Sequence, residues 1–324
     1  MKKFIIPLVA LVIAGIGLFF YLQNITKSGT ETVKEPEIKT PAVQEQVNVP
    51  QVDTAKEEPV NKPEDATSVP PVKEVENKSE TVIGKSAGGR NITAYHFGTG
   101  DKEILFVGGI HGGYAWNTSL LAYQVMDYFK ANPNTIPGGI KVTVVPVLNP
   151  DGLGKVVSVT GRFSATDVSS SSEAKVSGRF NADNVDLNRN FDCGWKASGV
   201  WQSTTVSGGS AAFSEPESAA IRDYTKGRKL AAVVGWYSAG GGVYSSSCGN
   251  GILPETQAIT DIYAKASGYT AYKNFESYQV SGDMTDWFAK NNVPAIGVLL
   301  SAHDNVELDK NLAGIKALFE NYSK

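Results

Sequence analysis

Histidine is scarce in this chain of 324 residues, which contains only His96, His111 and His303. Any metal site or catalytic dyad that depends on imidazole is therefore restricted to these three positions. A basic excess is also missing, because 30 Lys and Arg residues stand against 33 Asp and Glu residues, for a net charge of −3. Domains that bind nucleic acid normally carry a clear basic excess or stripe, so we expect no nucleic-acid partner.

Residues 24–80 lack Phe, Trp, Tyr, Leu, Met and Cys, and hold seven of the 15 prolines. Such a segment cannot bury enough apolar surface to offset the entropy lost on ordering. We therefore predict a disordered Pro-, Glu- and Lys-rich linker over residues 24–80 and one folded domain over residues 81–324. Apolar residues make up 41% of the whole chain, enough for a sizeable core in that domain.

One long apolar run occurs, from Phe4 to Leu22, directly after Lys2 and Lys3. A helix of this length spans roughly 28 Å, enough to cross the hydrocarbon core of a bilayer. A cleaved signal peptide is the alternative, but no small-residue cleavage site follows the run. We predict an N-terminal membrane anchor over residues 1–23, whose lysines stay in the cytoplasm. The protein is then a single-pass membrane protein with an extracytoplasmic C-terminal domain.

The chain contains only two cysteines, Cys193 and Cys248, both in segments rich in Gly or Ser. In an exported domain an even pair of cysteines is more typical of a disulfide than of two free thiols. A catalytic thiol would also need one of the three histidines beside it. We predict a disulfide between Cys193 and Cys248.

Strand-like and helix-like patterns alternate along the predicted domain. Short apolar runs predict strands over residues 104–108, 140–147, 230–236 and 295–300. Helical spacing predicts helices over residues 120–129, 215–224, 254–266, 284–290 and 308–322, with Ser214 and Glu217 forming a capping box. This alternation favours an α/β fold with a mixed, largely parallel central sheet flanked by helices. Because ligands bind beyond the carboxyl ends of such strands, the four loops after these strands should line one site.

Six short motifs lie in or beside the predicted loops and helix ends. They are Gly108–Gly112 (Gly-Gly-Ile-His-Gly), Asn149–Gly152 (Asn-Pro-Asp-Gly), Asp186–Phe191 (Asp-Leu-Asn-Arg-Asn-Phe), Ser214–Glu217 (Ser-Glu-Pro-Glu), Tyr278–Gly282 (Tyr-Gln-Val-Ser-Gly) and Asn311–Ile315 (Asn-Leu-Ala-Gly-Ile). In this order they resemble signature segments of the carboxypeptidase A-like zinc carboxypeptidases, over nearly all of the predicted domain. The resemblance implies that family's fold, a zinc cofactor, and metal-dependent hydrolysis of C-terminal peptide bonds.

Most residues that should perform this chemistry are replaced. His111 stands at the first zinc-ligand position, but the Glu that the family places three or four residues later is Tyr114 or Ala115 here. Tyr237 stands at the second His position, and Leu299 at the general base. Alkyl side chains neither bind zinc nor accept a proton, and a phenol with a pKa near 10 is a poor zinc ligand. We therefore expect zinc to be absent or weakly bound and hydrolysis to be impaired.

The carboxylate-binding half of the family site is better kept. Asn188 and Arg189 stand where the family clamps the C-terminal carboxylate of a bound peptide. Arg162 stands near the place of the family arginine that polarises the scissile carbonyl, although Arg179 competes for that role. Tyr278 is expected to cover a bound ligand, as the flexible tyrosine of the family does. The alternatives are surface ion pairs for the arginines and a packed aromatic for Tyr278.

Three functions remain open from the sequence. The favoured one is a membrane-anchored, exported domain that binds peptide or cell-wall stem-peptide carboxylates with impaired hydrolysis. The second is an active metallocarboxypeptidase with atypical ligands, for example His111, His303 and Asp304. The third is a non-catalytic protein-interaction scaffold. His96, on an alternating strand, is expected on a solvated face.

Overall fold

The computed structural model describes residues 79–159 and 161–324. The predicted membrane anchor and almost all of the predicted linker lie outside the described residues, and these two predictions stay predictions. Within the described part of the chain, no helix combines the length and apolar character needed to cross a membrane.

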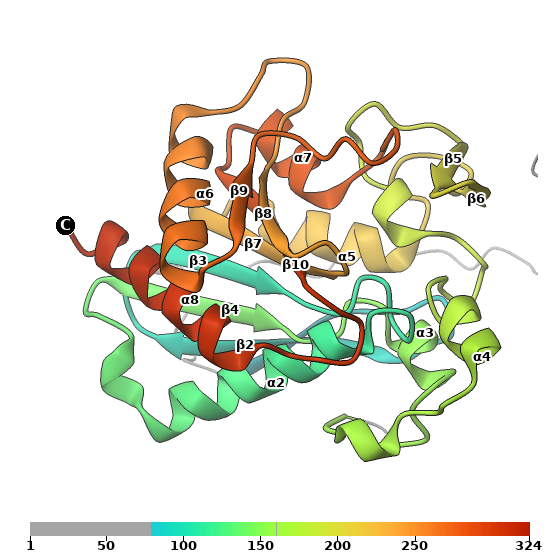
Figure 1. The fold of residues 1–324 in the computed structure, drawn as a ribbon, viewed down its shortest axis with the longest axis horizontal. Coiled ribbons are helices and arrows are strands. Elements are labelled where there is room, and N and C mark those ends of the chain that lie inside the picture. Colours follow the sequence, from blue (N-terminus) through green and yellow to red (C-terminus); the bar gives the residue numbers. More distant parts are fainter. Residues whose placement is uncertain (1–78, 160) are drawn as a thin grey trace, which may run out of the picture. The chain divides into compact units, whose positions relative to one another are not determined.

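The centre of the fold is an eight-stranded sheet in the order β1-β2-β4-β3-β7-β10-β8-β9 (Figure 1). Its strands are β1 (Glu80–Lys85), β2 (Asn91–Gly98), β3 (Lys102–Val107), β4 (Ile140–Val145), β7 (Leu230–Ser238), β8 (Gly242–Ser245), β9 (Thr270–Tyr272) and β10 (Ala295–Leu300). A separate two-stranded sheet pairs β5 (Ser198–Trp201) with β6 (Thr204–Ser207).

The four central strands β4, β3, β7 and β10 are parallel to one another. Most of their residues are apolar, as in β3, where Ile104 to Val107 form a buried apolar run. A strand that is covered on both faces needs such a continuous apolar run. Antiparallel strands β1 and β2 extend one edge, and β8 pairs antiparallel with β10 at the other. The predicted mixed, largely parallel α/β sheet is therefore confirmed.

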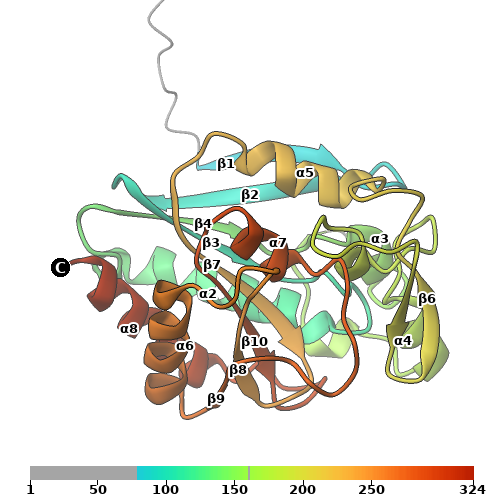
Figure 2. The same cartoon turned by 90° about the horizontal axis from the view of Figure 1, so that it is seen from above.

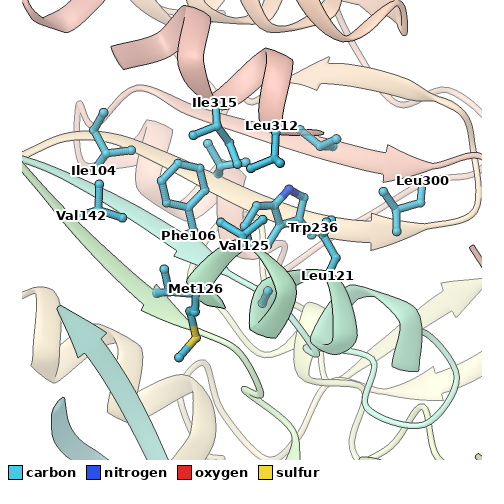
Figure 3. Close-up of a cluster of buried hydrophobic side chains, with 14 of the residues drawn as sticks. Ile104, Phe106, Leu121, Val125, Met126, Val142, Trp236, Leu300, Leu312 and Ile315 are labelled. Atoms are coloured by element: carbon cyan, nitrogen blue, oxygen red, sulfur yellow. The ribbon is translucent and has the colours of Figure 1, made fainter. Parts of the chain in front are cut away.

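Helices cover both faces of the sheet (Figure 2). The longer ones are α2 (Trp116–Ala131), α5 (Pro216–Thr225), α6 (Pro254–Ser267), α7 (Met284–Lys290) and α8 (Leu308–Tyr322). One core cluster joins the sheet to α2, α6 and α8, with Phe106 stacked on Trp236 at its centre (Figure 3). A second cluster joins the opposite face to α5 and α7. In the polar stretch between β4 and α5, the described residues form the short helices α3 (Pro150–Gly154) and α4 (Ser172–Ser177), 3-10 turns and the β5–β6 hairpin.

The predicted capping box of α5 is wrong. The helix begins at Pro216, and its N-cap, Glu215, makes no side-chain capping bond. Ser214 Oγ donates instead to the Glu215 carboxylate at 2.8 Å, and Glu217 accepts the backbone N–H of Ala87 at 3.0 Å. Ser214 Oγ also accepts the side-chain N–H of Asn190 at 3.0 Å, so bonds to Asn190 and Ala87 use the groups that the local pattern assigned to capping.

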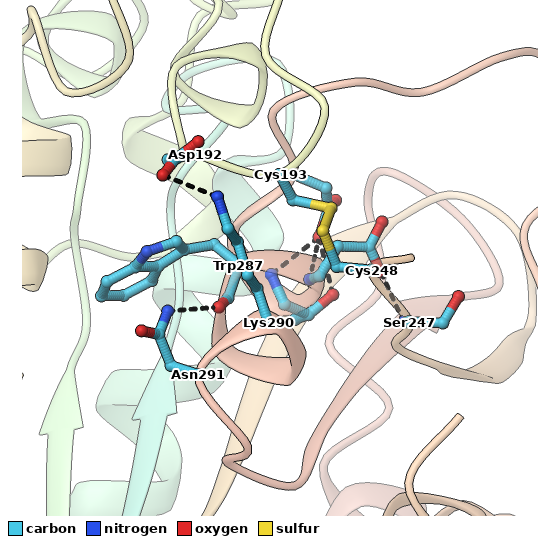
Figure 4. The surroundings of a disulfide bond; sticks show 10 residues. Asp192, Cys193, Ser247, Cys248, Trp287, Lys290 and Asn291 are labelled. Atoms are coloured by element: carbon cyan, nitrogen blue, oxygen red, sulfur yellow. Dashed lines mark hydrogen bonds and ion pairs between the residues drawn. A yellow bond between two sulfur atoms is a disulfide. The ribbon is translucent and has the colours of Figure 1, made fainter. Parts of the chain in front are cut away.

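The predicted disulfide is confirmed, because Cys193 and Cys248 are bonded, with their Cα atoms 5.9 Å apart (Figure 4). Cys193 also accepts the backbone N–H of Gly282 at 2.8 Å. On the other side, Ser247 donates its backbone N–H to Asp286 at 2.9 Å. The disulfide therefore ties together loops that support the start of α7.

Replacing both cysteines, Cys193→Ser and Cys248→Ser, should lower the free energy of unfolding by about 2–4 kcal/mol. The cross-link spans a sequence separation of 55 residues and restricts the unfolded chain accordingly. Denaturant unfolding of the double variant measures the loss, and the unmodified protein under a strong reductant serves as its control. An unchanged unfolding midpoint in both would contradict this assignment.

Candidate functional site

A cavity of about 750 Å³ lies beyond the carboxyl ends of β7 and β10. Most of the residues predicted to form the site line this cavity. They are His111, Tyr114, Asn188, Arg189, Tyr237, Tyr278, Leu299 and His303, together with Arg179. Ala115, Arg162 and Asp304 are not among the lining residues.

The loop after β3 is fixed by close backbone contacts. A Cβ atom on Gly109 would collide with Ser119, and one on Gly112 would meet the backbone of Gly152. Both glycines have positive φ angles, +66° and +41°, which favour glycine. The backbone N–H of Asn149 donates to Gly109 at 3.0 Å. The loop after β4 therefore packs against the loop that carries His111. It does not line the cavity, contrary to the sequence prediction.

His111 is held in the cavity wall as a neutral imidazole. The residue is 6% exposed, and neither ring nitrogen has a hydrogen-bond partner within the described part of the chain. Its Nε2 lies 3.7 Å from a carboxylate oxygen of Asp186. Burial, followed by the charge of Arg179, holds the pKa of His111 well below its usual value.

The residues at the other catalytic positions are chemically inert toward a metal. The ring of Tyr237 lies 5.8 Å from that of His111, and its buried hydroxyl has no hydrogen-bond partner among the described residues. Burial, with the charges of Asp283 and Asp286, raises the pKa of Tyr237 well above 10, so the side chain is a neutral phenol. Leu299 brings an isobutyl group to the cavity, and Ala115 is buried at the start of α2.

The donor set does not fit a catalytic zinc ion. Such an ion needs three protein ligands, usually imidazoles and carboxylates. Within residues 79–159 and 161–324, no group of three His, Cys, Asp or Glu side chains is placed to hold a metal. The alternative set of His111, His303 and Asp304 therefore does not converge either. Instead, His303 packs edge-on against Tyr114, with ring centroids 4.5 Å apart, and its Nδ1 lies 3.2 Å from Ser238 Oγ.

Arg179, the alternative to Arg162 in the sequence prediction, lines the cavity. Its Nε and Nη2 atoms lie 2.9 and 2.8 Å from Asp186, and both side chains are almost fully buried. Its guanidinium also lies 4.5 Å above the ring of Trp201. Burial pushes the pKa of Asp186 up, but Arg179 and then Arg189 outweigh it and hold that pKa below the usual value.

Arg162 lies elsewhere. Its guanidinium is 2.6 Å from Asp127 and 5.1 Å from the ring centre of Tyr123, both on α2, and its side chain is 42% exposed. Of the two candidates for this role, Arg179 lines the cavity and pairs with the buried Asp186, whereas Arg162 does neither. His96 also lies outside the cavity, between the hydroxyls of Thr81 and Thr143 at 3.0 and 3.1 Å.

Asn188 and Arg189 line the cavity side by side. Arg189 donates from Nε and Nη2 to the carbonyl of Val200, at 3.2 and 2.7 Å, and from Nη1 to the carbonyl of Asn188 at 2.7 Å. Its guanidinium lies 5.9 Å from the ring centre of Tyr278, which also lines the cavity. Asn188 donates its side-chain N–H to Asp283 at 2.7 Å and accepts the backbone N–H of Met284 at 3.1 Å.

Sequence reasoning missed several residues of the site. Asp283 and Asp286 line the cavity at the start of α7, where the sequence predicted only a helix over residues 284–290. Asn117, in the first turn of α2, donates its side-chain N–H to the carbonyls of Ala302 and Asn305 at 2.8 and 2.9 Å. It thereby holds the loop that carries His303. No local sequence pattern signals such a contact between distant segments.

The model of the zinc carboxypeptidase family matches residues 74–308. The chain belongs to this family. Among curated proteins, a gamma-D-glutamyl-L-diamino acid endopeptidase from Lysinibacillus sphaericus is 27% identical over 233 residues, which are 65% of this chain and 57% of that protein. The bacteriocin BCN5 of Clostridium perfringens is 27% identical over 168 residues, 49% of this chain and 16% of that protein. The chain thus matches less than two thirds of the length of either relative.

Solved structures of the family share the fold. Carboxypeptidase A from Helicoverpa armigera has a TM-score of 0.56 at 21% identity, over 75% of this chain and 66% of its own. Bovine thrombin-activatable fibrinolysis inhibitor has a TM-score of 0.61 at 15% identity, over 75% and 90% of the two chains. Murein-tripeptide amidase from Escherichia coli O157 has a TM-score of 0.53 at 19% identity, over 74% and 91%.

Proposed function

We propose that this zinc carboxypeptidase-family domain binds the C-terminal carboxylate of a peptide, or of a cell-wall stem peptide, in the cavity and hydrolyses it poorly or not at all. Arg189 and Arg179 would hold the carboxylate, and Tyr278 would cover it. The proposal rests on two buried guanidinium groups that line the same cavity. Among the described residues, this cavity has no set of three zinc ligands.

Both arginines keep hydrogen-bond donors for a ligand. Each terminal nitrogen of a guanidinium carries two hydrogens. Nη1 and Nη2 of Arg189 each donate one hydrogen bond to a backbone carbonyl, so each keeps one hydrogen for a ligand. Nη1 of Arg179 makes no hydrogen bond within the described part of the chain. A planar guanidinium that is fixed in place loses little entropy when a carboxylate binds to it in a bidentate manner.

The same wall supports the proposal of impaired hydrolysis. His111 is the one imidazole in a position that the family uses for zinc, and Leu299 cannot act as a general base. The remaining cavity groups that carry charge are suited to binding and orienting a peptide end.

Cell-wall peptides are proposed as ligands on two grounds. The relative from Lysinibacillus is named for an endopeptidase of gamma-D-glutamyl-L-diamino acid bonds, and the amidase from Escherichia coli for a murein tripeptide. The N-terminal apolar run after Lys2 and Lys3 supports a membrane-anchored domain on the outer side of the membrane, where such peptides occur.

Amidation of the ligand carboxylate should weaken binding at least about tenfold, because the charge that the arginines recognise is lost. The experiment compares the binding of fluorescently labelled tripeptides and of their C-terminal amides by anisotropy, using the full-length chain. Equal affinity for acids and amides would refute the carboxylate-binding function.

A pair of variants separates the clamp from a general effect of charge. Arg189→Lys keeps the charge but loses the planar fork, so it should reduce affinity for the free acids. Arg162→Lys makes the same exchange outside the cavity and should leave affinity unchanged. Equal effects of the two exchanges would argue that Arg189 has no special role.

A further inference from the structure

A serine hydroxyl and an imidazole meet in the cavity wall and have no part in the proposed function. Ser238 is the last residue of β7, and His303 lies in the loop after β10; both line the cavity. Ser238 Oγ lies 3.2 Å from Nδ1 of His303. A nucleophile and its general base need such a hydrogen-bonding separation, about 2.6–3.2 Å between heavy atoms. Because both groups line the cavity, a substrate that enters it can contact them.

One side chain, Asn117, positions both members of this pair. Its Nδ2 atom donates to the carbonyls of Ala302 and Asn305 at 2.8 and 2.9 Å, and these bonds hold the loop that carries His303. Both amide hydrogens are used in this way, so the side-chain oxygen is left for Ser238. That oxygen accepts the Ser238 O–H at 2.9 Å. Since Asn117 is fully buried, a fixed amide sets the separation between Ser238 and His303.

The ring of His303 presents Nδ1 as a proton acceptor. Burial, followed by the charge of Arg179, lowers the pKa of His303, whereas Asp304 and a hydrogen bond to the backbone of Tyr114 raise it to a smaller extent. The imidazole is therefore neutral at neutral pH and donates its single hydrogen to the Tyr114 backbone. Because Nδ1 faces Ser238, we assign this hydrogen to Nε2. Nδ1 then keeps its lone pair for the serine proton.

A second contact between imidazole and hydroxyl shows what sets this pair apart. His96 lies 3.0 and 3.1 Å from the hydroxyls of Thr81 and Thr143, at similar distances. The Thr143 hydroxyl, however, donates its proton to Glu103 at 2.6 Å, and His96 does not line the cavity. A histidine beside a hydroxyl therefore indicates chemistry only where the hydroxyl proton is available to the ring and a substrate can approach.

A positive charge stands beside the pair. The guanidinium of Arg179 lies 5.7 Å from the centre of the Tyr114 ring, which also packs against His303. Nη1 of Arg179 makes no hydrogen bond within the described part of the chain. When a serine attacks a carbonyl group, negative charge develops on the carbonyl oxygen, and a fixed cation in a cavity wall stabilises that charge.

We propose that Ser238 and His303 form a nucleophile–base pair that hydrolyses carboxylic esters without a metal ion. Ser238 Oγ bonds to the ester carbonyl carbon while its proton passes to Nδ1 of His303. The bond from that carbon to the alcohol oxygen then breaks, and His303 returns the proton to the departing alcohol. Water attacks the acyl-serine by the same route, which releases the carboxylic acid and restores the Ser238 hydroxyl.

Esters are the substrate class because the pair lacks the third member of a full triad. Nε2 of His303 donates to a backbone carbonyl and not to a buried carboxylate, and Asp304 is exposed. The imidazolium formed in the first step is therefore only weakly stabilised. An alkoxide or phenolate leaves the tetrahedral intermediate more readily than the nitrogen of a peptide bond does. Peptides bound in the cavity stay intact, in agreement with the proposed function.

The test labels the full-length chain with diisopropyl fluorophosphate, which phosphorylates a serine that a neighbouring base activates. Peptide mass spectrometry should place one label per chain on Ser238, at a rate that a chelator does not change. This measurement needs no variant and does not depend on how an exchange affects folding. An unlabelled Ser238 would overturn the proposal and leave the carboxylate-binding function intact.

Matched variants assign the two roles through the turnover of p-nitrophenyl acetate in the presence of a chelator. Ser238→Ala should reduce turnover to the uncatalysed rate, and His303→Gln should reduce it at least about 100-fold. Ser277→Ala removes a hydroxyl from another serine that lines the cavity, and His96→Gln removes an imidazole outside it. Both controls should keep the turnover of the unmodified chain. Unchanged turnover in Ser238→Ala or His303→Gln, or an equal loss in the controls, would contradict the assignment.

Discussion

A triple variant with Ala115→Glu, Tyr237→His and Leu299→Glu should bind zinc stoichiometrically and release C-terminal residues at least about 100-fold faster than the unmodified chain. The exchanges supply a carboxylate, a second imidazole and a general base around His111, and general acid–base catalysis alone is worth about 10²–10⁴ in rate. Any single exchange should remain at background, because one additional group completes neither the ligand set nor the base. Zinc content and chelator-sensitive turnover measure the two effects.

Two companion variants make this result specific. The cavity is lined by Tyr114 and not by Ala115, so a parallel triple variant with Tyr114→Glu shows which position supplies the missing carboxylate. A double variant of Ala115→Glu and Leu299→Glu retains one imidazole and should stay free of stoichiometric zinc. Chelator-sensitive turnover of about 1 s⁻¹ or more by the unmodified chain would contradict impaired hydrolysis and favour atypical ligands.

Arg179→Met should lower the free energy of unfolding by about 3–5 kcal/mol at neutral pH, because it leaves Asp186 buried without its main partner. In the unmodified chain the pKa of Asp186 lies below its usual value. The pair therefore stabilises the fold fully at a pH above the usual pKa of an aspartate, and this stabilisation is lost as the pH falls through the lowered pKa. In the variant, burial dominates and raises this pKa. The difference in the free energy of unfolding between the unmodified chain and Arg179→Met should therefore shrink as the pH falls and Asp186 takes up a proton.

Chemical denaturation at several pH values measures this loss. Arg222→Met is the matched control, since Arg222 pairs with Asp223 at 2.8 Å on the surface, where such pairs contribute about 0–1 kcal/mol. A loss in Arg179→Met as small as that in Arg222→Met would show that the pair with Asp186 does not stabilise the cavity wall.

The sequence predicted the central strands of the sheet, but it did not predict the edge strand β9. Strands β3, β4, β7 and β10 could be recognised because strands buried on both faces are continuous apolar runs. The edge strand β9 has three exposed residues and no such run. Its pairing with β8 depends on the chain bringing the two segments together, which no local pattern encodes.

The site was predictable where a motif specifies a backbone position. His111, Tyr237, Leu299 and Arg189 occupy one cavity because each lies at or near the end of a strand or in a fixed loop. Arg162 was misplaced because the spacing between motifs does not show which arginine turns inward. That choice depends on the buried carboxylate of Asp186, a contact visible only in three dimensions.

Calorimetric titration of the zinc-supplemented, full-length chain with N-acetyl-Ala-Ala-Lys and with its amide tests the central claim most directly, provided that the recovered ligand is analysed by mass spectrometry. The structure predicts saturable binding of the acid, recovery of the intact peptide, and no binding of the amide. Equal binding of the amide, or chelator-sensitive cleavage of the acid to N-acetyl-Ala-Ala, would contradict a carboxylate-binding domain with impaired hydrolysis.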